Sequence, residues 1–202
     1  MLLRPPGGAA PCRPRRPEAL SMSSILAAAD LTTILRASVF AAHKHRNQWR
    51  KDVDASPYIN HPLMLAHVLS AEGGVSDAAT LCAALLHDTI EDTDTQADEV
   101  AREFGDEIAT LVMEVTDDRT LAKAERKRLQ IEHAATISDK AKRVKLADKI
   151  SNLRDVAHSP PAGWSLERRR EYFDWAKAVV DRLRGVDARL EAVFDEAYSG
   201  RP

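Results

Sequence analysis

An apolar run that leads directly into four ionisable residues constrains this chain most. Residues 81–92 read LCAALLHDTIED, so small and apolar side chains come immediately before His87 and Asp88. Glu91 and Asp92 follow about one helical turn later. Carboxylates and an imidazole that are buried without partners cost several kcal/mol. A metal ion is the simplest single partner for all of them, so the run predicts a buried helix that ends at a metal site.

Helical periodicity recurs along the rest of the chain, with Ser, Thr or Asp before many of the periodic segments and Gly after several of them. The predicted helices cover Ile25 (capped by Ser23 and Ser24) to about Trp49, Pro62 to about Glu72, Ala78 (capped by Asp77) to about Thr89, a short segment from Thr95 to Phe104, Asp106–Val115, Lys123–His133, Ser138–His158, Ser165 to Gly185, and Asp187 to about Tyr198. We find no alternating segment long enough for a sheet, no repeat and no Gly-rich phosphate loop. We therefore predict an all-α bundle of about eight to ten helices.

The length of 202 residues suits one domain, which we place at residues 23–202. Residues 1–22 are dense in Pro, Gly and Arg and contain a single acid, Glu18, so we predict a disordered tail. An alternative is that Met22 is the true initiator. A transit peptide fits poorly, because five prolines interrupt its helix.

Composition excludes several classes of function. The formal net charge of -2 shows no basic excess, so we do not expect nucleic-acid binding. The longest apolar runs fall far short of the roughly 20 residues that cross a bilayer, so we expect no membrane span. Cys12 and Cys82 are too few for a disulfide framework, which favours a reducing compartment, and we predict a cytoplasmic protein. The oligomeric state stays open.

Other segments supply further candidate metal ligands. Asp148 lies inside the apolar stripe of the predicted helix at 138–158, where an acid needs a partner, and His61 stands at a predicted helix start. A lone residue of either kind is more often structural, and the prediction depends on their combination. The candidate ligands are two imidazoles and two carboxylates from three predicted helices: His61, His87, Asp88 and Asp148. This mixed set suits Mn²⁺, Fe²⁺ or Zn²⁺, of which we favour Mn²⁺.

Several motifs occur in one order between Ala37 and Ala178. They are FAAHKHRNQWRKD, PYINHP, AALLHDTIEDTDT, EVTDD, ERKRLQ, KLADKISNLRD and GWSLERRREYFDWA. In this order the chain resembles the HD-domain superfamily of metal-dependent phosphohydrolases. Within it, the chain resembles the small alarmone hydrolases, among them the metazoan SpoT homologues, which are stand-alone relatives of the hydrolase domain of RelA/SpoT proteins.

The resemblance implies an all-helical bundle with the four metal ligands named above. It also implies Mn²⁺-dependent removal of the 3′-pyrophosphate from the guanine nucleotides guanosine tetraphosphate and pentaphosphate, and it assigns Glu91 and Asp92 to catalysis. The residues agree, because acids at a helix C-terminus oppose the helix dipole and need another reason to be there. Such a pair can hold the attacking water or protonate the departing ribose oxygen, and which residue does which stays open.

The same resemblance places Arg50, Lys51 and Asn152 against the nucleotide. Guanidinium groups stack on bases and bind phosphate oxygens, which suits this role. Two structural alternatives stay open. A basic cluster at a helix C-terminus also complements the dipole, and Asn152 lies one turn from Asp148, where it would support the metal site. The basic run from Lys123 to Arg128 is interpreted as a solvated helix face, with Lys123 within reach of substrate as an alternative.

Two features differ from relatives. The loop at residues 52–58 lacks the Gly-containing turn that relatives carry before Pro-Tyr, so its conformation is expected to differ. The chain ends at Pro202 without room for a synthetase domain, so we expect it to degrade the alarmone and not to make it. Two other functions stay open: an NADPH 2′-phosphatase or other nucleotide phosphohydrolase with the same site, and a non-catalytic module that binds the alarmone and signals to a partner.

Overall fold

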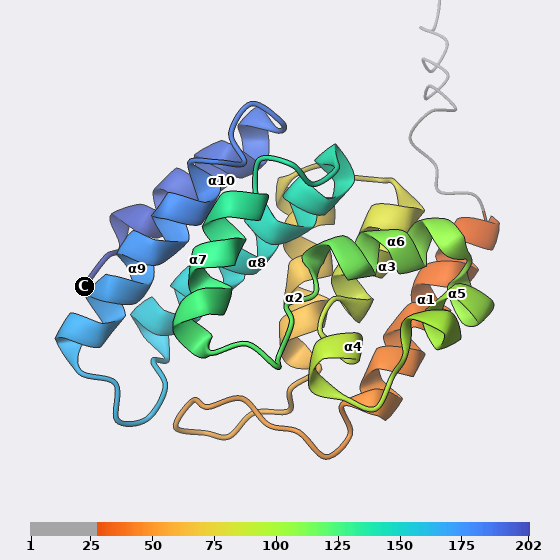
Figure 1. The fold of residues 1–202 in the computed structure, drawn as a ribbon, viewed down its shortest axis with the longest axis horizontal. Coiled ribbons are helices and arrows are strands. Elements are labelled where there is room, and N and C mark those ends of the chain that lie inside the picture. The colour runs from red at the N-terminus through yellow and green to blue at the C-terminus, as the bar shows by residue number, and fades with distance from the viewer. Residues whose placement is uncertain (1–27) are drawn as a thin grey trace, which may run out of the picture.

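The helix that contains the apolar run lies at the centre of the fold. The structure, a computed structural model, describes residues 28–202. In it, α3 (Ala78–Leu86) packs against α1 (Ala28–Lys44), α2 (Asn60–His67), α6 (Asp106–Val115) and α8 (Asp139–His158) (Figure 1). Every α3 residue from Thr80 onward is buried. A helix that is apolar on all sides needs neighbours on all sides, which explains its central place.

The remaining elements surround this centre. They are the π-helical turn η2 (Val68–Glu72), α4 (Thr89–Asp92), α5 (Ala97–Phe104), α7 (Lys123–His133), α9 (Leu166–Val180) and α10 (Ala188–Ser199). Across residues 28–202 there is no strand, only an isolated bridge between Trp49 and Pro57 that closes the loop after α1. The predicted all-α bundle is therefore confirmed.

Most of the predicted helix starts are also confirmed. The side chains of four cap residues accept a hydrogen bond from a backbone N–H in the first turn of α3, α8, α9 and α10. These residues are Asp77, Ser138, Ser165 and Asp187. The bounds of α6 and α7 are those that the sequence predicts. The predicted tail at residues 1–22 and the predicted helix start at Ile25 lie outside the described residues.

Several predicted bounds are wrong. The helix after Thr95 begins at Ala97, because the Thr95 hydroxyl pairs with that of Thr93 instead of capping. Helix α1 ends at Lys44 and not near Trp49, because Trp49 enters the bridge with Pro57. The second helix changes to π-helical hydrogen bonding at Val68, and α9 ends at Val180, before Gly185.

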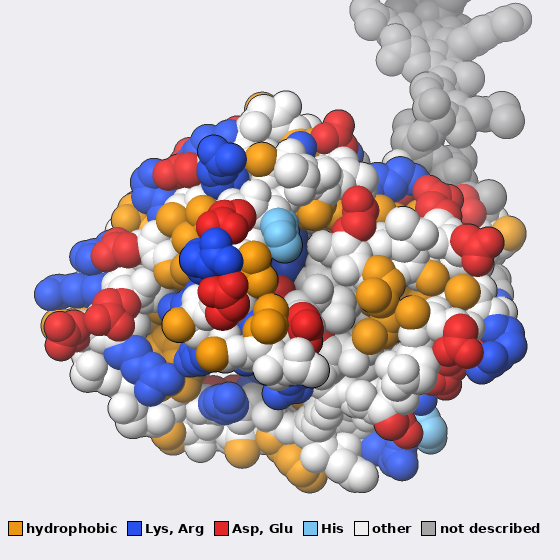
Figure 2. All heavy atoms as spheres, in the orientation of Figure 1, with side chains coloured by type: hydrophobic (Ala, Val, Ile, Leu, Met, Phe, Trp, Pro, Cys, Tyr) orange, Lys and Arg blue, Asp and Glu red, His pale blue; other side chains and the backbone are white. Residues whose placement is uncertain are grey.

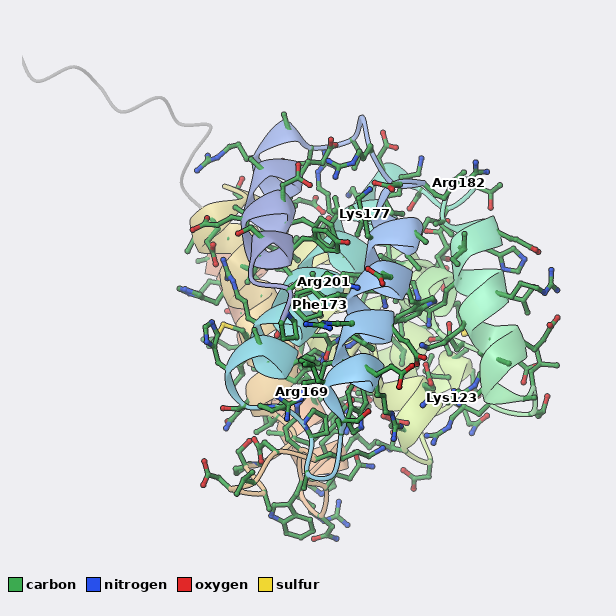
Figure 3. All side chains as sticks on the ribbon, turned by 90° about the vertical axis from the view of Figure 1, so that its left-hand side faces the viewer. Lys123, Arg169, Phe173, Lys177, Arg182 and Arg201 are labelled. Atoms are coloured by element: carbon green, nitrogen blue, oxygen red, sulfur yellow. The ribbon has the colours of Figure 1, made fainter. Side chains whose placement is uncertain are left out.

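The C-terminal helices form a second layer on α8. Helices α9 and α10 both pack against α8, and Phe173 and Phe194 are fully buried there. Figure 3 labels Phe173 where α9 meets α10, and its ring lies 6.0 Å from that of Tyr198 of α10, centroid to centroid. This layer holds α8 between two sets of helices, so residues along it keep a fixed position relative to α3.

The surface of this body is mixed in charge. Figure 2 shows acidic and basic side chains alternating over α7, where Arg128 pairs with Glu125 and Glu132. No helix among the described residues is both long and apolar enough to cross a membrane.

Candidate functional site

His87 and Asp88 lie at a break between two helices. The predicted helix over Ala78 to Thr89 is in fact interrupted: α3 ends at Leu86, and Asp88 has φ -98° and ψ -2° before α4 begins at Thr89. The Thr89 hydroxyl donates to the carbonyl oxygen of Leu86 at 2.6 Å, so the break leaves this buried acceptor satisfied. His87 and Asp88 therefore lie at the junction of α3 and α4, here called the corner, and not inside one continuous helix.

The four predicted metal ligands meet at this corner. His61, His87 and Asp88 each offer a donor atom within 4.8 Å of the others. Asp148, from α8, joins them through His61, since its Oδ1 lies 3.3 Å from Nε2 of His61. Nε2 of His87 lies 2.9 Å from Oδ2 of Asp88. Both imidazoles are almost fully buried, so the cluster is a desolvated polar site inside an apolar body.

The chemistry of the donors fits a metal ion. Nδ1 of His87 lies 2.9 Å from the carbonyl oxygen of Ala84, which can only accept, so this nitrogen carries the proton and Nε2 keeps its lone pair for a metal. Nδ1 of His61 faces the hydroxyl of Ser151 at 3.4 Å, a group that can accept a proton from Nδ1 or donate one to it. Two imidazoles and two carboxylates are a donor set that suits a divalent cation.

Charges within the cluster favour the ionised acids. Burial alone raises the pKa of Asp88, but the charge and hydrogen bond of His87 outweigh it and hold that pKa well below its ordinary value. For Asp148, burial is outweighed by the charge of Lys149 and by His61, which hold its pKa well below the ordinary value. Burial lowers the pKa of His61, against the hydrogen bond to Asp148. These directions leave both acids ionised and His61 neutral, as a metal requires. Burial lowers the pKa of His87, but the charge and hydrogen bond of Asp88 outweigh burial and raise that pKa, so a metal at His87 would have to displace a proton.

Glu91 and Asp92 lie beside this cluster on α4, and arginines hold both. Oε1 of Glu91 accepts from Arg126 of α7 at 3.2 Å, and its Oε2 accepts from the backbone N–H of Asp117 at 3.2 Å. The carboxylate of Asp92 pairs with Arg119 from the loop before α7. Burial raises the pKa of Glu91 to about 7, and nearby carboxylates, Asp117 foremost, add to this. Glu91 therefore titrates near neutral pH, which suits a group that takes up or gives a proton.

Tyr58 connects the metal cluster to the acid pair and was missed by the sequence analysis. Its hydroxyl donates to Asp88 and lies 3.3 Å from Oδ2 of Asp92. The ring of His45 lies 4.8 Å from the Tyr58 ring, centroid to centroid, and holds it in place. The PYINHP motif puts this tyrosine three residues before His61, but nothing in the sequence indicates that its hydroxyl bridges two acids from another helix.

The predicted substrate-binding residues line one cavity, of about 380 Å³. Arg50 donates to Oδ1 of Asn152 at 3.2 Å and to Asp155 at 2.5 Å, while Nδ2 of Asn152 donates to Asp148 at 2.5 Å. Asn152 thus touches both the predicted metal ligand and the predicted base-binding arginine, a position compatible with either of the roles left open for it. Lys51 is exposed at the rim of this cavity. Asp155 was not singled out in the sequence.

A second groove adjoins the first between α7 and α9. It has about 580 Å³ and shares Trp164 and Tyr172 with the first cavity. Basic side chains lie over its aromatic rings, with Arg168 4.5 Å from the Trp164 centroid and Lys127 4.7 Å from that of Trp175. Lys123 stands at the end of α7 on one side of it (Figure 3). The basic run on α7 is thus only partly a solvated face, because part of it lines this groove.

Comparison with known proteins agrees with this geometry. The family model of the HD domain matches residues 37–174. The chain belongs to the HD-domain family. HD-domain membership and the His-Asp corner together indicate a divalent metal site in this chain.

Two close relatives share the name guanosine-3′,5′-bis(diphosphate) 3′-pyrophosphohydrolase MESH1. The protein from Xenopus tropicalis is 55% identical over 169 residues, which cover 84% of this HD-domain chain and 94% of the relative. The protein from Homo sapiens is 53% identical over 168 residues, or 83% of this chain and 94% of the relative.

Two solved structures share the fold of this HD-domain chain. One, described as a metazoan orthologue of SpoT that hydrolyses ppGpp, superposes with a TM-score of 0.81 at 50% identity and covers 84% of this chain and 95% of its own. The other, lmo0812 from Listeria monocytogenes, gives a TM-score of 0.58 at 30% identity over 71% of this chain and 94% of its own.

Proposed function

We propose that this HD-domain chain is a metal-dependent 3′-pyrophosphohydrolase that converts guanosine tetraphosphate or pentaphosphate into GDP or GTP and pyrophosphate. One observation carries the proposal: the buried corner of His61, His87 and Asp88 opens beside Glu91 and Asp92, next to a nucleotide-sized cavity. The relatives named above, two of them MESH1 proteins that are more than half identical over most of the chain, support the same reaction.

The reaction consumes one water, breaks the bond between phosphorus and the ribose 3′-oxygen, and returns a proton to that oxygen. His61, His87, Asp88 and Asp148 would hold a divalent cation, which would act as a Lewis acid on a phosphoryl oxygen and lower the pKa of a bound water. Glu91 and Asp92 accept the proton of the attacking water and donate a proton to the departing ribose oxygen. Because Glu91 titrates at about pH 7, it exists in both protonation states at neutral pH. Tyr58 orients Asp88 and Asp92 through its hydroxyl.

Substrate recognition is assigned to the cavity beside the metal corner. Arg50 presents its guanidinium to the base and phosphates, with Asn152 and Asp155 holding it in place. Lys51 at the rim adds a charge for a phosphate. The partner of this protein is thus a small guanine nucleotide.

We assign Mn²⁺ to the site, with Zn²⁺ and Fe²⁺ as the alternatives. Two nitrogen and two oxygen donors suit each of these ions better than Mg²⁺ or Ca²⁺, which prefer oxygen, or a thiolate-preferring metal. Metal analysis of protein purified without added metal separates the three. We also propose a cytoplasmic location, in line with the reducing compartment that the cysteine content favours.

The groove between α7 and α9 favours a second candidate, an NADPH 2′-phosphatase activity of the same site. Its aromatic floor extends past the first cavity, so a dinucleotide with a second ring would find a stacking surface there. Measuring kcat/KM for both substrates in one preparation decides between them. Arg168→Ala, which changes a side chain that lines the second groove and not the first cavity, is expected to lower kcat/KM for the dinucleotide more than for the guanine nucleotide.

A product assay tests the first function. Purified protein with Mn²⁺ should release pyrophosphate and GDP from guanosine tetraphosphate, resolved by ion-exchange chromatography. Glu91→Gln and Asp92→Asn should each lower kcat by about 10²- to 10⁴-fold and still bind Mn²⁺. Glu132→Gln, on the outer face of α7, is the matched control and should be as active as wild type. Activity that persists in excess chelator would refute the proposal.

A further inference from the structure

Helix α7 turns two side chains toward the site and carries charge on its outer face. None of its residues is fully buried, and cavities of about 200 and 580 Å³ lie on its two flanks. Arg126 and Gln130 are four residues apart, so they share one face, opposite the outward-pointing Arg128. Apolar packing alone holds α7 weakly, and its polar contacts therefore decide where it sits.

Gln130 makes two hydrogen bonds that require opposite ends of its amide. Its Oε1 accepts from Nζ of Lys149 at 3.0 Å, and its Nε2 donates to Oδ2 of Asp117 at 2.5 Å. An ammonium can only donate and a carboxylate can only accept, so the amide has one workable orientation. Among uncharged side chains, only Gln combines this reach with both a donor and an acceptor.

Through Lys149, Gln130 is connected to the predicted metal ligand Asp148. Lys149 is 3% exposed, donates to Oδ2 of Asp148 at 2.8 Å and faces the ring of Trp175 at 4.5 Å. Besides these neighbours, its ammonium has Gln130 as a partner. A buried ammonium with three donors needs such acceptors, so Gln130 fixes where Lys149 holds Asp148.

Through Asp117, Gln130 is connected to Glu91 of the acid pair. The backbone N–H of Asp117 donates to Oε2 of Glu91, and its carboxylate lies 3.7 Å from Nζ of Lys145. Arg126, from the same face of α7 as Gln130, donates to the other oxygen of Glu91. One short helix thus contacts the partners of both Asp148 and Glu91.

We infer that Gln130 is a positioning residue that couples the two halves of the site, holding Lys149 against the metal ligand Asp148 and Asp117 against Glu91. This inference rests on the proposed function. Outer partners of metal ligands set ligand orientation, and their loss typically costs tenfold to a hundredfold in metal affinity or activity.

Mn²⁺ binding to purified protein, measured by equilibrium dialysis without nucleotide, tests the Lys149 side. Gln130→Leu keeps the volume and removes both bonds, and it should raise the Mn²⁺ dissociation constant about tenfold. The fold should survive, since α7 has no buried residue. Ile131→Ala is the matched control: it loosens the packing of α7 on the core, so it should lower Tm but leave Mn²⁺ affinity unchanged.

Kinetics test the Asp117 side. Gln130→Leu should lower kcat at saturating Mn²⁺ while KM for the nucleotide stays within about twofold, because no substrate contact is removed. An unchanged Mn²⁺ dissociation constant together with an unchanged kcat in Gln130→Leu would overturn the inference. Equal losses of Mn²⁺ affinity and kcat in Ile131→Ala would also overturn it, because they would show that Gln130 acts only through the packing of α7.

A double-mutant cycle closes the test. If Gln130 acts on Asp148 through Lys149, then Lys149→Met and the double variant should show the same Mn²⁺ dissociation constant within about twofold. Additive effects would overturn the inference. If the wild-type protein neither binds Mn²⁺ nor releases pyrophosphate, the proposed function is refuted, and the inference with it. If the wild-type protein is active and the Gln130 variants match it in Mn²⁺ affinity and kcat, only the inference is refuted.

Discussion

Nε2 of His61 lies 3.3 Å from Oδ1 of Asp148, which joins α2 to α8 at the floor of the metal corner. The two residues come from distant parts of the chain, and neighbouring side chains contact each of them: Ser151 contacts His61, and Lys149 and Asn152 both donate to Asp148. An imidazole nitrogen and a carboxylate oxygen approach this closely inside a protein only with a proton or a cation between them, and a divalent cation bound by both would fill that role.

Removing either kind of ligand should therefore abolish metal binding. His87→Ala and Asp148→Ala are expected to lose bound Mn²⁺ during dialysis and at least about 10²-fold in pyrophosphate release. Asp148→Ala should also lower the free energy of unfolding by about 3–5 kcal/mol, because it removes the carboxylate that pairs with the buried Lys149 ammonium. Metal content by mass spectrometry and urea unfolding measure both effects. His43→Ala, at an exposed position on α1, is the control, and retained metal in Asp148→Ala would remove this residue from the ligand set.

Arg50 should act in substrate binding through its planar shape as well as its charge. Arg50→Lys keeps the charge and loses the fork that reaches both Asn152 and Asp155. KM for guanosine tetraphosphate should rise about tenfold, equivalent to about 1.4 kcal/mol, with a smaller change in kcat. Steady-state kinetics at saturating Mn²⁺ provide the measurement. Arg46→Ala, whose guanidinium contacts the His43 carbonyl instead, should behave as wild type. A loss confined to kcat would place Arg50 in the chemistry and not in binding.

The raised pKa of Glu91 predicts a pH-dependent stability. Burial raises this pKa from 4.5 to about 7, so the folded protein binds the proton more tightly than the unfolded chain does. The stabilising contribution of Glu91 is complete below about pH 4.5 and is lost as the pH rises through 7. Glu91→Gln stays neutral, so in metal-free protein at pH 8 it should be more stable than wild type, by on the order of 1–3 kcal/mol.

Urea unfolding between pH 4.5 and 8.5 checks this prediction. The stability difference between Glu91→Gln and wild type should vanish at the acid end. Glu132→Gln, an exposed carboxylate, should show no such trend. A wild-type protein as stable as Glu91→Gln at pH 8 would mean that Arg126 keeps Glu91 ionised at little cost.

Gly73 should resist substitution for steric reasons. A Cβ at this position would stand 2.7 Å from the carbonyl oxygen of Leu69 and 2.8 Å from Cδ2 of Leu190, where η2 meets α10. Gly73→Ala is expected to cost about 1–3 kcal/mol by overpacking. Gly200→Ala, with a nearest contact of 3.4 Å and an ordinary φ of -78°, should change stability by less than about 0.5 kcal/mol. Thermal unfolding of the two variants gives the comparison, and equal Tm values would mean that α10 shifts freely.

The order of amino acids is enough to predict the helices and the chemical groups of the site. Caps such as Asp77 and Ser138 and the bounds of α6 and α7 follow from local rules, because a cap side chain and a helical period act within a few residues. The buried acid Asp148 and the His87-Asp88 pair are visible for a similar reason: charge inside an apolar stripe needs a partner wherever it lies.

Tertiary structure alone decides which of these groups meet and what orients them. The Tyr58 hydroxyl on two acids and the Gln130 amide between Lys149 and Asp117 depend on contacts between α4, α7, α8 and the loops after α1 and α6. The hydrogen bonds from Tyr58 and Gln130 span large separations in sequence, and each needs a donor and an acceptor placed to within a few tenths of an ångström by packed helices. Helical periodicity cannot specify that placement, since it identifies which face of a helix is buried but not which atoms of another helix it will touch.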